Sequence, residues 1–214
     1  GETSQWEPRL VENTIAVEPP HDEKYHLSED MAVRGIDWLR KHRSFAPDKP
    51  FFMYWAPGAA HGPHQVGKEW SGKYKGKFDA GWDAYRERVF ARQKQLGWIP
   101  ADTKLTPRAA NMPSWASIPE SQRPFQLRLM EIYAGFGAYA DSEVARLVDA
   151  VNDLGELDNT LIIYINGDNG TSAEGGPMGT PNEVAWFNGV NELPADVQMK
   201  WYDVWGTEQT YNHM

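Results

Sequence analysis

The stretch TLIIYINGDNG, residues 160–170, joins a short apolar run to a loop of glycine and polar residues. The run at residues 160–165 has no helical period and is apolar on both faces, which is typical of a buried strand in a parallel sheet. A second run of this kind, FFMYW at residues 51–55, ends at a loop that contains glycine and proline. We expect both runs to lie in one sheet and to point in the same direction.

Helical patterns precede these two runs. Ser28 is positioned to cap a helix whose apolar residues recur at helical spacing. Further helices are expected over residues 78–96, over residues 119–154 and, as a short one, near residues 193–202. Residues 1–27 are rich in proline and are expected to be irregular. The order of elements favours an α/β fold with a parallel sheet covered by helices.

The composition restricts the class of protein. The chain has 214 residues, of which 41% are hydrophobic, so residues 1–214 can form one globular domain or a large part of one, and we expect no second domain. The formal charge of −9 argues against a nucleic-acid binder. No apolar run approaches the roughly 20 residues that a membrane-spanning helix needs. The sequence has no cysteine, which excludes disulfides, thiolate metal sites and a cysteine nucleophile within it.

Four polar residues follow the two apolar runs closely. His61 and His64 come after the first run, and Asp168 and Asn169 come after the second. In open α/β sheets, ligands bind beyond the carboxyl ends of the strands. A histidine there can donate a proton or bind an anion, and two neighbouring oxygen donors can contribute to a Ca²⁺ or Mg²⁺ site.

Simpler explanations exist for the same residues. Asp-Asn-Gly is also an ordinary turn sequence, and two loop histidines can lack any role. The pair His-x-x-His resembles a metal clip, but Pro63 between its members disfavours the helical geometry that makes such pairs converge. No serine lies in a nucleophile-elbow motif, so a serine hydrolase has little support.

A short basic run interrupts this acidic chain. A solvated surface is the simpler interpretation, and a positive patch near an anion site is the alternative. The run consists of Lys68, Lys73, Lys75 and Lys77.

Two longer stretches resemble the sulfatase family, in particular the bacterial arylsulfatases. They are PFFMYWAPGAAHGPHQVGKEW, residues 50–70, and YAGFGAYADSEVARLVDAVNDLGELDNTLIIYINGDNGTSAEGG, residues 133–176. The resemblance covers most of residues 30–190, and the helix, apolar strand and GDNG loop in succession are far more specific than either short motif.

The resemblance implies a fold and a chemistry. The implied fold is the alkaline-phosphatase-like α/β fold, with a mixed, mostly parallel sheet flanked by helices. The implied reaction is hydrolysis of a sulfate monoester by a formylglycine nucleophile with Ca²⁺ as the metal. Asp168 and Asn169 match the family's Asp-Asn metal ligands. His61 matches a histidine that contacts the sulfate and is placed to protonate the leaving oxygen. His64 belongs to the same loop pattern and is also expected to bind the substrate.

The sequence also departs from the family pattern. It contains neither the C/S-x-P-x-R motif that yields formylglycine nor the early Asp-Asp metal pair. We therefore expect an internal piece of an arylsulfatase with an incomplete fold, inactive alone, whose formylglycine lies in the N-terminal part of the parent. Two alternatives remain open: a non-catalytic α/β fragment or anion-binding module, and a phosphodiesterase or phosphonate hydrolase of the same superfamily.

These expectations extend to partners and location. The expected substrate is a small-molecule sulfate ester, and neither nucleic acid nor a membrane span is expected. Missing neighbouring strands would leave sheet edges exposed, and such edges favour self-association. The parent protein is expected in the periplasm or outside the cell.

Overall fold

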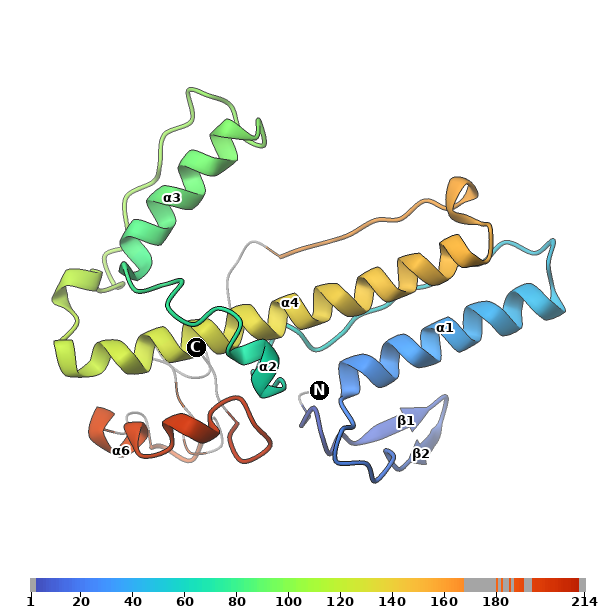
Figure 1. The fold of residues 1–214 in the computed structure, drawn as a ribbon, viewed down its shortest axis with the longest axis horizontal. Helices are drawn as coiled ribbons and strands as arrows, with labels where there is room; N and C mark the ends of the chain where they lie inside the picture. The colour runs from blue at the N-terminus through green and yellow to red at the C-terminus, as the bar shows by residue number, and fades with distance from the viewer. Residues whose placement is uncertain are drawn as a thin grey trace.

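The computed structural model describes residues 3–167, 180, 182, 185, 187–190 and 194–211. Long helices dominate it, and the elements are drawn in Figure 1. The longer elements among these residues are the strands β1 (Leu10–Glu12) and β2 (Ile15–Val17) and the helices α1 (Leu27–Phe45), α2 (Lys68–Ser71), α3 (Gly81–Gln95), α4 (Arg123–Asp153) and α6 (Ala195–Met199). Short 3₁₀ turns are η1 (Trp115–Ser117), η2 (Glu120–Gln122), η3 (Leu157–Asn159) and η4 (Tyr202–Val204).

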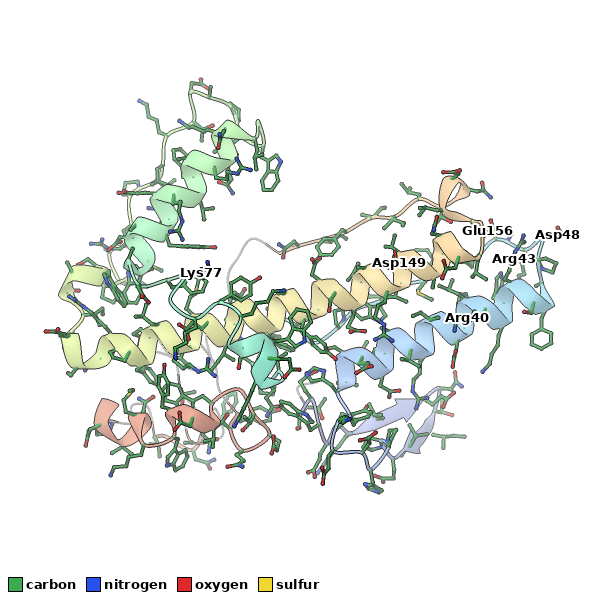
Figure 2. The ribbon with its side chains drawn as sticks, viewed as in Figure 1. Arg40, Arg43, Asp48, Lys77, Asp149 and Glu156 are labelled. Atoms are coloured by element: carbon green, nitrogen blue, oxygen red, sulfur yellow. The ribbon has the colours of Figure 1, made fainter. Side chains whose placement is uncertain are left out.

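The helices α1 and α4 form the centre of the fold. Figure 1 shows α1 lying along the C-terminal half of α4. Small and branched side chains make the contact, because Ala32 and Ile36 of α1 meet Leu147 and Ala150 of α4 in one buried cluster. Beyond this cluster, Arg43 forms an ion pair of 3.0 Å with Glu156, just after α4 (Figure 2).

The predicted first helix is confirmed, but its cap differs. The Nδ1 atom of His26 accepts a hydrogen bond from the backbone N–H of Ser28, so the N-cap is His26 and Ser28 lies inside the first turn. Ser28 is fully buried, and its hydroxyl donates to the side-chain oxygen of Gln5. Ser28 therefore does not cap the helix, and its hydroxyl instead binds the N-terminal segment through Gln5.

The N-terminal half of α4 packs against the C-terminal segment and against α2. Phe125, Leu129 and Ile132 enclose the buried ring of Trp205 from the C-terminal segment. On another side, α2 comes so close that a Cβ at Gly135 would lie 2.5 Å from the carbonyl oxygen of Trp70. Glycine at this position is therefore what allows the backbones of α2 and α4 to touch.

The two predicted strands are not paired in the described residues. Residues 51–57 and 160–167 are extended, and both run back along the helices toward the middle of the molecule (Figure 1). Neither has a hydrogen-bonded strand partner among the described residues, whose one sheet is the antiparallel β1–β2 hairpin with Val11 opposite Ala16. The expectation of a parallel sheet is thus wrong for the described residues. Residues 1–27, which we expected to be irregular, contain the β1–β2 hairpin.

The remaining helix predictions were right in kind. A short helix, α6, lies within residues 193–202, and α4 ends at Asp153, just before Gly155 with its positive φ of 73°. The second expected helix is α3, but it begins after Phe78 and buries little of its surface, because it projects away from the helix pair (Figure 1). Among the described residues, no helix is both long and apolar enough to cross a membrane.

Candidate active site

The loop that follows residues 51–57 carries both candidate histidines. His61 lies at the exposed part of the loop, and its Nδ1 atom is 3.1 Å from the carbonyl oxygen of Gly62. The next residues are buried without interruption as far as Val66. The loop therefore presents one histidine at the surface and encloses the other.

His64 is fully buried against α4. Its Nε2 atom is 3.2 Å from the carbonyl oxygen of Ala60, four residues earlier in the same loop. Its ring lies edge-on to that of Tyr133, with centroids 5.2 Å apart, and is tilted against Phe136 at 6.4 Å. These contacts close the loop on itself and fix it to the middle of α4.

Gln65 ties the loop to distant parts of the chain. Its side-chain oxygen accepts from the backbone N–H of Gln5 at 2.9 Å, and its amide nitrogen donates to the carbonyl of Thr210 at 2.7 Å. The neighbouring Val66 N–H donates to the carbonyl of Gly206 at 2.9 Å. Since all these groups are buried, the base of the loop is rigidly positioned while His61 stays exposed.

The histidine that caps α1 also holds this loop. His26 donates from Nε2 to the backbone carbonyl of Gln65 at 3.1 Å, while its Nδ1 accepts from Ser28, so both bonds require the neutral ring. Burial lowers the pKa of His26 to about 4, and the bond to Gln65 and the charge of Glu69 only partly oppose this. The loop is therefore coupled to the start of α1 through a histidine that stays uncharged.

The predicted metal ligands cannot be placed. Asp168 and Asn169 lie outside the described residues, which end on this side at Gly167, at the end of the second extended segment. Within the part of the chain that is described, no group of three or more His, Asp or Glu side chains converges as a metal site would require. The carboxylate and amide oxygens of Asp168 and Asn169 are hard donors suited to Ca²⁺, which takes six or more oxygen ligands.

The described residues therefore form two long helices that each precede an extended apolar segment, with an anchored histidine loop after the first segment. The Sulfatase family model matches residues 1–202, and the chain belongs to the sulfatase family. This family implies the alkaline-phosphatase-like fold.

Two relatives support the assignment. An uncharacterized sulfatase of Schizosaccharomyces pombe is 30% identical over 200 residues, which cover 91% of this chain and 36% of that protein. An arylsulfatase of Klebsiella aerogenes is 28% identical over 152 residues, covering 71% of this chain and 32% of that protein. The chain thus matches about a third of the length of each relative.

Sequence reasoning missed the residues that position the loop. Gln65, His26 and Tyr133 come from three separate elements, and their contacts with the loop follow from the tertiary fold. One local signal did exist, because the sequence HLSED places a possible capping side chain two residues before Ser28. The roles expected for His61 and His64 stay predictions, although their different burial now separates them.

Proposed function

We propose that this chain supplies part of the active site of an arylsulfatase, in which His61 protonates the leaving-group oxygen as the S–O bond of a sulfate monoester breaks. The observation that carries this proposal is the contrast within one loop, where His61 is exposed and residues 62–66 are buried and anchored. A general acid must be accessible to the substrate and held in place, and both conditions are met at this position.

The other members of the site complete the proposal. Asp168 and Asn169 would hold a Ca²⁺ ion, which when bound polarises a sulfate oxygen and orients the ester. The sequence contains no C/S-x-P-x-R motif, so the formylglycine nucleophile would come from the rest of the parent enzyme. His64 would act as a positioning residue, because its ring is enclosed between Ala60 and Tyr133 and cannot reach a substrate without displacing them.

The test uses the full-length parent enzyme and a series of aryl sulfates. His61→Ala should lower kcat by about 10²–10⁴-fold, the usual contribution of a positioned general acid. The loss should be largest for phenyl sulfate and smaller for nitrophenyl sulfate, whose leaving group needs little protonation. His21→Ala, at another exposed histidine, is the matched control and should leave kcat unchanged.

Three outcomes would contradict the proposal. One is full activity of the His61→Ala enzyme, and another is an equal loss for every leaving group, which would indicate binding without proton transfer. The third is faster turnover of a phosphodiester than of any aryl sulfate, which would favour the phosphodiesterase alternative. His64→Ala should lower the unfolding temperature, which separates its role from that of His61.

A further inference from the structure

The segment between α2 and η1 is basic, although the chain is acidic. Residues 73–112, which we call the arm, contain nine Lys and Arg against four Asp and Glu, whereas the whole chain has a formal charge of −9. The arm contains α3 and the segment that returns from it, and Figure 1 shows it projecting from the helix pair. Positive charge is thus concentrated on a part of the described structure that projects away from the helix pair.

Contacts within the arm and at its base stabilise its conformation. Arg86 donates to both the carbonyl and the hydroxyl oxygen of Thr106 at 2.7 Å, and this joins α3 to the returning segment. At the base, the ring of Trp82 lies edge-on to that of Trp115 at 4.9 Å, and Asp83 pairs with Arg108 at 3.2 Å. A projection braced in this way can present charges in fixed positions.

Most of these charges are not neutralised by neighbouring carboxylates. Among the described residues, Arg108 is the arm cation that has a carboxylate partner. Lys77, Arg88 and Arg92 are exposed, and they lie in one row because Arg88 donates to the backbone carbonyl of Lys77 and Arg92 follows one helical turn later. Figure 2 shows Lys77 at the base of the arm, close to α4.

The base of the arm adjoins the histidine loop. The backbone N–H of Gly76 donates to Glu131 of α4 at 2.9 Å, and Tyr133, two residues further along α4, packs against His64. Tyr133 is also close enough to Tyr85 of α3 to interact with it electrostatically. The row of cations therefore starts close to α4, the helix on which the histidine loop packs, and leads away from it.

We propose that the arm binds the polymer chain of a sulfated polysaccharide, so that the substrate of this site is a sulfate ester within a polyanion and not the small molecule expected from the family resemblance. The inference rests on the proposed function, because the cations can guide a sulfated chain to the site only if the site binds a sulfate ester. Sulfate groups on neighbouring sugars would meet Lys77, Arg88 and Arg92 in succession. The exposed indole of Trp98 offers an apolar face of the kind that packs on sugar rings.

The experiment measures binding of dextran sulfate to the 214-residue chain by calorimetry at low salt, with neutral dextran as the comparison ligand. The double variant Lys77→Glu/Arg92→Glu should weaken binding at least about tenfold, because two attractions become repulsions. The matched control Arg40→Glu/Lys41→Glu makes the same charge change on exposed positions of α1 and should bind nearly as well as the unaltered chain. Binding should also fall steeply with added salt.

Other results would overturn the inference. These are no binding of dextran sulfate, equal binding of neutral dextran, an equal loss in both double variants, or tighter binding of a nucleic-acid oligomer. In the parent enzyme, Lys77→Glu/Arg92→Glu should raise KM for a sulfated polysaccharide and leave turnover of nitrophenyl sulfate unchanged. Failure of the proposed function would appear instead as an unaffected His61→Ala enzyme, so the two failures are distinguishable.

Discussion

The helix pair and the two extended segments are both rich in apolar residues, yet they bury them very differently. The facing sides of α1 and α4 are closed over a continuous cluster. In the first extended segment, Met53 and Trp55 pack on that cluster, whereas Phe52 and Tyr54 are 87% and 80% exposed. Exposure alternates along the segment with the period of two that a β-strand has.

The second extended segment repeats this behaviour only in part. Ile162 is 44% exposed, while Ile163 next to it is 71% exposed. In the first segment one face packs on the helices, whereas in the second segment every side chain from Leu161 to Ile165 is exposed and the alternation is only partial. A sequence that is apolar on both faces calls for a second covering layer and for neighbouring strands. The difference teaches that the α1–α4 pair buries its apolar residues within the described part of the chain, whereas the two segments lack neighbouring strands there.

The largest expected effect on stability comes from a Phe→Ala substitution, which we compare between the helix pair and the first extended segment. Phe136→Ala removes a fully buried ring of α4 and should lower the free energy of unfolding by about 3–5 kcal/mol. Phe52→Ala removes an equally large but exposed ring from the first segment, and the change should be within about 0.5 kcal/mol. Urea unfolding followed by circular dichroism measures both.

Similar losses for the two variants would contradict the comparison. They would mean that the outward face of residues 51–57 is covered in solution, as self-association of the exposed segments would cause. Measuring Phe52→Ala at two protein concentrations decides this, since a loss caused by association grows with concentration.

The sequence predicted the helices far better than the sheet. The apolar period of 3.6 residues in α1 and α4 is a local signal, and the two helices appear where it indicates. Strand pairing depends on which distant segments meet, and nothing within residues 51–57 or 160–167 specifies a neighbour. The sequence pattern therefore identified the two segments as apolar and extended, and it failed on their partners.

In the candidate site, too, the features set by local sequence were predictable and those set by tertiary contacts were not. His61 and His64 were found because they follow an apolar run, a local pattern. Their different burial was not predictable, because it arises from Gln5, Tyr133 and Thr210, which the fold brings to the loop from the two ends and the middle of the chain. The cap by His26 was missed for a related reason, since serine is by far the commoner capping residue.

An intermediate effect should appear in the pH dependence of stability. The folded pKa of His26 is lowered to about 4 by burial, from an ordinary value of 6.5. Between these values the unfolded chain binds a proton that the folded chain does not, so the free energy of unfolding falls as pH is lowered through this window. The loss should be on the order of 3 kcal/mol between pH 7 and pH 4, measured as urea midpoints.

A variant at this histidine isolates the contribution. His26→Asn keeps a side chain that can cap α1 but does not titrate, so it should flatten this part of the pH profile. His21→Asn, at an exposed histidine, should keep the slope of the unaltered chain. An unchanged slope in His26→Asn would mean that other groups, such as carboxylates in ion pairs, cause the acid sensitivity.

The smallest expected effect on stability is that of the ion pair near the start of both extended segments. Arg43 near the end of α1 pairs with Glu156, just before the second segment, and the two side chains are 42% and 23% exposed (Figure 2). At that exposure, a double-mutant cycle of Arg43→Ala and Glu156→Ala should give a coupling of about 0.5 kcal/mol, which 1 M salt should nearly abolish. The cycle is needed because Arg43 also donates to the carbonyl of Pro47. That bond is lost whenever Arg43 is replaced, with or without Glu156, so its contribution cancels in the coupling energy. A salt-resistant coupling several times larger would show that the segment starts are held as tightly as the helix pair, and the contrast between the two regions would then begin further along each segment.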